Sequence, residues 1–212
     1  MEIKTIKQLN QAILDKYNEP KERKIGRYSA TDVNKIRIGD LTPENFFEPN
    51  KIDMKGVKNI FRGYAYENQL LKEFNELGIE QERNGDDQIK IEYDLLNDRI
   101  MNEGDEAEIV LVMKPDFVLP KVVLETKSPN KIRDSIPHWY LDQCEIQHRL
   151  LNKKIVMVII NTFDNDLDLL LGIEYKPSDV RWKNIKEIIK NFDLTLRKYV
   201  QQQKSKRNRN NG

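Results

Sequence analysis

The fold is best predicted from residues 114–127, KPDFVLPKVVLETK. Residues 122–126 are mostly apolar or β-branched, which favours a strand, and Pro120 is typical of a turn. The stretch therefore predicts a β-hairpin. If the chain folds back symmetrically about Pro120 and the residue after it, Asp116 lies directly opposite Glu125.

The turn of this hairpin sets the register. Proline cannot take the positive φ that the favoured two-residue hairpin turns need at its position, so we expect a longer or bulged loop. A four-residue loop keeps Asp116 opposite Glu125, whereas a three-residue loop shifts the pairing by one position.

The paired carboxylates predict a cation site. Two carboxylates that face each other cost up to roughly 1 kcal/mol on a sheet, and more where water is excluded. A cation between them removes that cost, and a site made of oxygen ligands favours Mg²⁺ or Mn²⁺. Side chains alternate along a strand, so Glu125 and Lys127 project from the same face.

At these residues the chain resembles the PD-(D/E)xK nuclease superfamily. The matching residues are Pro115-Asp116 and Glu125-Thr126-Lys127, with nine residues from the Asp to the Glu. The expected order of elements around them also resembles the superfamily core over about residues 61–175. By length and its Lys- and Asn-rich composition, the chain further resembles nucleases of this superfamily from spindle-shaped viruses of hot-spring archaea, although many Asn and Gln residues argue against a thermophilic source.

The resemblance implies two further site residues. Glu67 ends the run Gly63-Tyr-Ala-Tyr-Glu67, which looks like the Gly-x-x-x-Glu helix of RecB-type members, where the Glu helps to hold the metal. The alternative is a salt-bridged or surface Glu67. In the same members a Gln on the helix after the hairpin points toward the active site, which implies Gln143. A Tyr follows four residues later there, whereas Gln147 stands here, so a core or helix-cap role for Gln143 is the alternative.

Periodicity and the resemblance together predict an α/β fold with a mixed central β-sheet flanked by helices. We expect an N-terminal helical and loop elaboration over residues 1–60, an αβββαβ restriction-endonuclease-like core over 61–200, and a basic disordered tail over 201–212. Helices are expected at 3–17, just after Ser29, and at 61–77, 138–152 and 180–199; strands are expected at 88–95, 107–119, 122–127, 155–160 and 167–173. On the 138–152 helix, Trp139 and Gln143 share a stripe with apolar residues.

Composition excludes several classes of protein. The single cysteine, Cys144, excludes a disulfide framework and the four-cysteine iron–sulfur cluster of RecB-type relatives. No apolar run approaches the roughly 18 to 20 residues that span a membrane, and the N-terminus lacks the apolar core of a secretory signal. We therefore expect no membrane association and a cytoplasmic location, in the host cytoplasm if the protein is viral.

The charge distribution says more than the net charge of +1. All 35 acidic residues precede Arg197, whereas six of the 36 basic residues lie from Arg197 onward. Such an end either solubilises the chain or binds phosphates without sequence preference. Lys131 and Arg133 follow the hairpin in a predicted loop, where we expect them to bind DNA phosphates.

The resemblance implies a Mg²⁺-dependent deoxyribonuclease that hydrolyses phosphodiester bonds, with Mn²⁺ as a substitute. Asp116 and Glu125 are expected to bind the metal directly, the Thr126 carbonyl to add a ligand, and Glu67 to complete the shell. Lys127 is expected to orient or deprotonate the attacking water, and Gln143 to position water or phosphate. Exonuclease and endonuclease action both stay open.

Two alternatives remain at this stage. One is a structure-selective endonuclease of the Holliday-junction type, which normally acts as a symmetric homodimer. The other is a catalytically inactive DNA-binding protein on the same fold. All three hypotheses have DNA as the partner, and replication or recombination proteins are further candidates.

Overall fold

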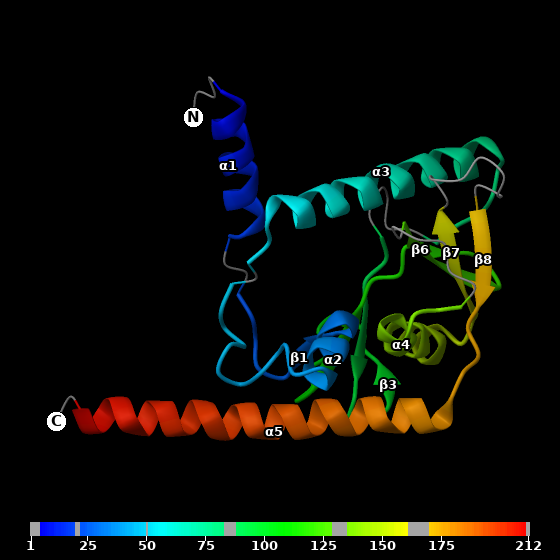
Figure 1. Ribbon diagram of the computed structural model, residues 1–212. Coiled ribbons are helices and arrows are strands. Elements are labelled where there is room, and N and C mark those ends of the chain that lie inside the picture. The colour runs from blue at the N-terminus through cyan, green and yellow to red at the C-terminus, as the bar shows by residue number, and fades with distance from the viewer. Residues whose placement is uncertain are drawn as a thin grey trace.

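The computed structural model describes residues 5–19, 22–49, 51–82, 88–128, 135–160 and 170–210 (Figure 1). Its helices are α1 (Ile6–Tyr17), α2 (Ala30–Arg37), α3 (Met54–Glu76), α4 (Leu141–Leu151) and α5 (Asp179–Asn210), with a short 3-10 helix η1 (His138–Tyr140) before α4. Its strands are β1 (Arg27–Ser29), β2 (Ile91–Asp94), β3 (Arg99–Ile100), β4 (Val110–Met113), β5 (Phe117–Val118), β6 (Val122–Lys127), β7 (Lys154–Ile160) and β8 (Leu170–Glu174).

The strands form two four-stranded mixed sheets, with the orders β1-β4-β2-β3 and β5-β6-β7-β8. The mixed α/β class with flanking helices is confirmed, but the sequence predicted one central sheet and one strand over 107–119. The structure divides that strand into β4 and β5, each in a different sheet. Pro115 lies at the division and has no N–H to donate to a strand ladder, which favours a break there.

The register of the β5–β6 hairpin is the predicted one. Phe117 pairs with Leu124 and Val118 with Val123, the pairing that sets Asp116 opposite Glu125. The Leu119 N–H donates to the Val122 carbonyl at 2.8 Å, which closes the turn. On the other side of β6, β7 runs parallel, and this apolar strand is a central one, as its composition predicted.

Helix α2 begins where the sequence predicted a cap. The Ser29 side chain accepts from the Asp32 N–H, and the Asp32 carboxylate accepts from the Ser29 N–H at 2.9 Å. This reciprocal pair satisfies donors that the first helical turn leaves without helical partners.

The first sheet, α2 and α5 enclose one hydrophobic core. Tyr28, Val33, Ile185 and Ile189 have no exposed surface in it. Part of the predicted N-terminal elaboration therefore belongs to the core of the protein. Strand β1 was not predicted, because its three residues alternate too briefly to give a strand pattern.

Gly26 allows β1 to approach β4 closely. Its φ is +80°, and a Cβ at this position would lie 2.3 Å from the Glu108 carbonyl oxygen. The Gly26 carbonyl accepts from the Val110 N–H at 2.7 Å. Only glycine fits this conformation and this spacing without strain.

Helix α4 contributes residues to the apolar clusters of both sheets. Ile146 and Leu150 face the core of the first sheet, and Cys144 faces the apolar cluster beside β6 and β7. The Glu145 carboxylate, which has no exposed surface, accepts from the Tyr175 hydroxyl and from the Ser178 N–H at 2.8 Å. These contacts fix α4 relative to the segment that joins β8 to α5.

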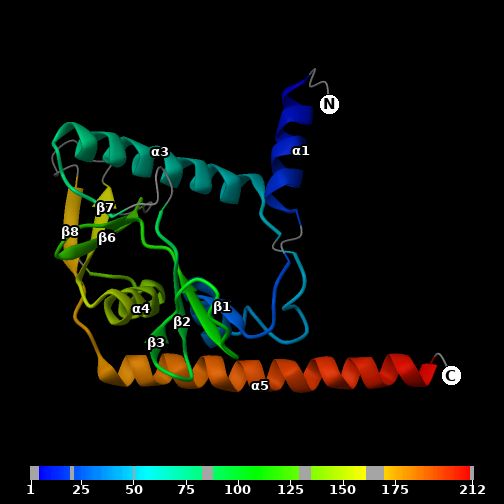
Figure 2. The ribbon, with the colours of Figure 1, turned by 180° about the vertical axis from the view of Figure 1, so that it is seen from behind.

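Helices α3 and α5 lie along opposite sides of the molecule in both views (Figures 1 and 2). Helix α3 packs on the hairpin sheet through Leu70, which clusters with Phe117 and Ile160. The Phe74 and Phe117 rings meet edge to face at 5.1 Å. This packing brings the helix that carries Glu67 next to the predicted site.

The prediction of a disordered tail is wrong for residues 201–210, because they continue α5 as a helix. Gln, Lys and Arg dominate this segment, no proline or glycine interrupts it, and these residues favour helices. Figure 2 shows the end of α5 extending past α2 and the first sheet. Among the described residues, no helix is long and apolar enough to cross a membrane.

Candidate active site

Glu125 is the centre of the candidate site. It lies on β6, and only 1% of its surface is exposed. Lys127, on the same face of β6, donates to Glu125 Oε1, and Gln143 Nε2 donates to the same oxygen at 2.6 Å. Gln147 Nε2 donates to Glu125 Oε2 at 2.5 Å. One strand and one helix therefore hold both oxygens of a buried carboxylate.

Asp116 lies just before β5, and its carboxylate is held by Thr126 on β6, the other strand of the hairpin. Its Oδ2 accepts from the Thr126 N–H at 2.7 Å and from the Thr126 hydroxyl at 2.8 Å. Its Oδ1 accepts from Gln88 Nε2 at 3.2 Å. Thr126 thus positions the Asp116 carboxylate, a role that the sequence analysis did not assign to it.

The three charged groups of the site act on one another. Burial raises the pKa of Glu125, and the negative charge of Asp116 raises it further, against the opposing effect of Lys127. Burial disfavours the charge on Lys127, but Glu125 and Asp116 outweigh this effect and raise the Lys127 pKa. The site thus combines two carboxylates that act on each other with one half-buried ammonium.

Lys127 also contacts an aromatic ring. Its Nζ lies 5.0 Å from the centroid of the Tyr140 ring, at the end of η1. A cation over an aromatic face is attracted by the ring quadrupole. Tyr140 therefore restricts where the ammonium can lie.

Glu67 is half-buried on α3, the helix that packs on the hairpin sheet. Earlier on α3, Arg62 Nη2 donates to the Ser128 carbonyl at 2.9 Å, which holds the helix against the end of β6. Within the described parts of the chain, no three His, Cys, Asp or Glu side chains form a group that could hold a metal ion. Glu67 as a third metal-binding group stays a prediction, as does the Thr126 carbonyl.

Several solved structures share this fold. One is an alkaline exonuclease (LHK-Exo) from Laribacter hongkongensis, with 13% sequence identity, 94% of this chain and 98% of that chain covered, and a TM-score of 0.55. The chain therefore shares the overall fold of this exonuclease. LHK-Exo in complex with dAMP matches at 14% identity over 87% of this chain and 95% of that chain, with a TM-score of 0.56.

The protein SSO0001 also shares the fold of this chain. Its identity is 14%, it covers 90% of this chain and 86% of that chain, and the TM-score is 0.55. No protein-family model matches the sequence, and the comparison with curated proteins gives no significant match.

Sequence reasoning missed the role of Gln147. Position 147 was noted only because Gln stands where RecB-type members have Tyr, yet Gln147 is fully buried and binds Glu125 directly. The available signal was the spacing, because residues four apart share one helix face. Gln143 and Gln147 therefore had to project from α4 in the same direction.

The contacts of Gln88 with Asp116 and of Tyr140 with Lys127 were also not predicted. Gln88 belongs to the predicted strand over 88–95, but it precedes β2 and its side chain reaches Asp116. Lys131 and Arg133, the predicted phosphate-binding residues, lie outside the described residues.

The buried thiol of Cys144 is not a nucleophile in this site. Burial, and then the negative charge of Glu125, raise the pKa of Cys144 to about 12. The thiol is therefore protonated near neutral pH, and a thiolate mechanism is disfavoured.

Replacing Gln147 with Leu should destabilise the protein by about 1 to 3 kcal/mol, because Glu125 then loses one donor in a buried environment. Urea unfolding of wild type and Gln147→Leu measures the change. The exposed Gln201→Leu on α5 is the matched control, and we expect it to leave the midpoint almost unchanged. Equal midpoints for all three proteins would contradict a role for Gln147 in holding Glu125.

Proposed function

We propose that this protein is a metal-dependent deoxyribonuclease. One observation carries the proposal. The buried Glu125 carboxylate is held by Lys127 and by two glutamines, and the negative charge of Asp116 raises its pKa. A purely structural core rarely places a half-buried carboxylate beside a fully buried one, because burial is costly for a charge and the two charges repel each other. The nuclease fold of the structural neighbours supports this choice of reaction.

The residues fit a divalent cation such as Mg²⁺ or Mn²⁺. Oxygen atoms are the ligands that these ions prefer, and the site offers two carboxylates whose repulsion is only partly offset by Lys127. Gln147 Oε1 is a further buried oxygen, and within the described residues it has no hydrogen-bond partner. Asp116 and Glu125 would hold the ion, with the Thr126 carbonyl and Glu67 as further ligands. When bound, the ion supplies Lewis-acid activation of phosphate and water.

The other roles in the proposed reaction belong to side chains of the protein itself. Lys127 is the positive group next to Glu125, so it offsets the charge that builds on the phosphate in the transition state and orients the attacking water. Gln143 and Gln147 keep the Glu125 carboxylate in one orientation. Thr126 does the same for Asp116. Preorganised groups of this kind lower a barrier without reorganising during the reaction.

DNA is the proposed substrate and partner, with exonuclease or endonuclease action as the open choice. The substrates that separate these are labelled single-stranded, duplex and four-way-junction DNA, each with Mg²⁺, Mn²⁺ or EDTA. Selective cleavage of the junction would favour the Holliday-junction type of enzyme and a homodimer. Binding without cleavage of any substrate would favour an inactive DNA-binding protein.

Lys127→Met should separate catalysis from binding, because Met keeps most of the side-chain volume and removes the charge. We expect the cleavage rate to fall by roughly 10² to 10³, which is typical for the loss of one preorganised electrostatic group. DNA affinity, measured with Ca²⁺ in place of Mg²⁺ to suppress turnover, should change far less.

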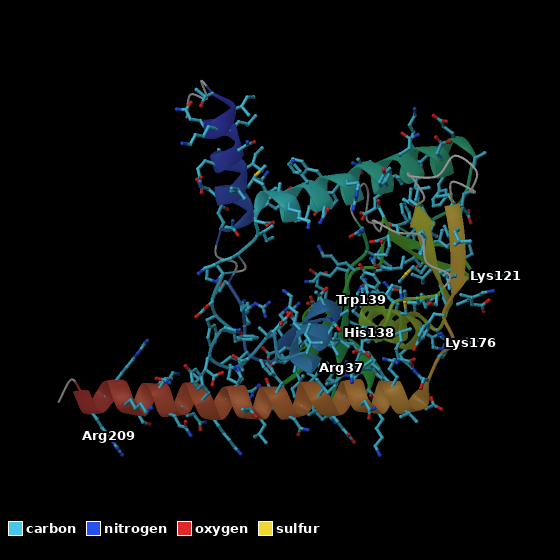
Figure 3. The ribbon with its side chains drawn as sticks, viewed as in Figure 1. Arg37, Lys121, His138, Trp139, Lys176 and Arg209 are labelled. Carbon is cyan, nitrogen blue, oxygen red and sulfur yellow. The ribbon has the colours of Figure 1, made fainter. Side chains whose placement is uncertain are left out.

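The matched control for Lys127→Met is Lys121→Met. Lys121 lies at the tip of the same hairpin and points outward into solvent (Figure 3). Its cleavage rate should equal that of wild type. Full activity of Lys127→Met would remove this residue from the mechanism.

The end of α5 is a second candidate contact with DNA. Lys198, Lys206 and Arg209 line one shallow depression of the helix surface together with Gln201, Gln202 and Ser205. No acidic residue follows Asp193, so this part of the helix is uniformly basic. A rigid basic helix that extends beyond the body presents its charges to phosphates without sequence preference.

Truncation after Val200 should flatten the salt dependence of DNA binding. The slope of log K against log salt should fall by about 0.9 on duplex DNA for each phosphate that the shortened helix no longer neutralises. Val200 is kept because it packs against the core. The double variant Lys206→Gln with Arg209→Gln keeps the helix and should flatten the slope in the same direction. An unchanged slope in both proteins would show that the end of α5 does not bind DNA.

A further inference from the structure

Three aromatic residues in sequence form the turn that leads into α4. His138, Trp139 and Tyr140 make up η1, and α4 begins only at Leu141. The sequence placed Trp139 on an apolar stripe of the following helix, but this prediction is wrong. Residues 138–140 form a 3-10 turn before that helix begins, and the Trp139 side chain is 38% exposed.

The three rings run outward from the catalytic ammonium. Lys127 Nζ lies over the Tyr140 ring, and the centroids of Tyr140 and Trp139 are 5.9 Å apart. The Trp139 and His138 rings meet edge to face at 4.8 Å. In the view of Figure 3, Trp139 and His138 lie between α3 and α5. A large aromatic ring is thus presented to solvent one ring away from the proposed reaction centre.

Two arginines bind one acidic residue at the start of α4. Arg37 donates to the two oxygens of Asp142 at 2.8 and 3.1 Å, and Arg181 donates to the same carboxylate at 2.9 Å. One carboxylate offsets only one of these two positive charges, so the start of α4 keeps a net positive charge. The exposed Trp139 ring offers a flat, largely apolar face that can pack on another flat ring.

We infer that Trp139 stacks on the base of an unpaired nucleotide next to the scissile phosphate. The inference rests on the proposed function, because the DNA phosphate at Lys127 places the neighbouring base near η1. Bases within a duplex are covered on both faces by their neighbours, so only a single strand or an opened end offers a free face. Stacking on aromatic side chains is the common way in which proteins hold such bases without reading their sequence. The site would therefore prefer single-stranded DNA or opened ends to closed duplex.

Tryptophan fluorescence tests the contact directly and does not require cleavage. The chain has two tryptophans, Trp139 and Trp182, and the second packs on Tyr93. With Ca²⁺ in place of Mg²⁺, a single-stranded oligodeoxynucleotide should quench the emission of wild type. The same oligonucleotide should leave the emission of Trp139→Phe, which retains Trp182, almost unchanged.

Two further probes separate stacking from charge. An oligomer of the same length with abasic sugars keeps the phosphates and lacks the bases, so it should not quench Trp139. A covalently closed duplex of the same sequence should not quench it either. Equal quenching by the abasic oligomer, or by the closed duplex, would overturn the inference.

Affinity and cleavage provide the second readout. Trp139→Ala should weaken single-strand binding by roughly 5- to 150-fold, the range for loss of one base–aromatic stack. Trp139→Phe should recover most of that affinity, and KM on single strands should rise more than kcat falls. Phe47→Ala, which removes an aromatic ring that is 52% exposed on another element, is the matched control and should match wild type.

The results distinguish this inference from the proposed function. If wild type cleaves DNA but single strands neither quench Trp139 nor depend on it, the inference fails and the nuclease stands. If the quench follows Trp139 and the bases but no DNA is cleaved, the stacking position stands and the nuclease fails.

Discussion

The structure of the site depends on one constraint, a negative charge buried on β6. Glu125 is almost completely removed from water, and a buried carboxylate must be compensated by donors or by a cation. Lys127 supplies the opposite charge from the same strand, whereas Gln143 and Gln147 supply neutral donors from α4. The orientation of the Glu125 carboxylate therefore depends on the position of α4, because each glutamine must reach one of its two oxygens.

The packing of α4 follows from the same requirement. Its residues face the cores of both sheets, and Glu145 on the helix is held by the Tyr175 hydroxyl and the Ser178 N–H. The buried Glu145 carboxylate thus anchors α4 to the segment between β8 and α5, while Gln143 and Gln147 of the same helix bind Glu125. Rigid elements hold site residues more closely than loops do, and this arrangement uses a strand and a helix.

The hairpin and the site core could be predicted from sequence because they depend on local patterns. Register follows from the strand sequence and the turn, so the pairing of residues 117 and 118 with 124 and 123 was within reach. The division into two sheets, the core role of Tyr28 and the contact of Gln147 with Glu125 depend on residues far apart in the chain. Trp139 lies in a 3-10 turn before α4, and periodicity does not distinguish such a turn from the first turn of an α-helix. The resemblance to viral nucleases stays a prediction.

The central claim is that Asp116 and Glu125 form one divalent-cation site. Calorimetric titration with Mn²⁺, in the absence of DNA, tests it most directly on wild type, Asp116→Asn and the surface control Asp15→Asn. We expect wild type and the control to bind the ion alike, and Asp116→Asn to bind it roughly tenfold more weakly or worse while it remains folded. Absence of Mn²⁺ binding by wild type, or equal affinity in Asp116→Asn, would contradict the account.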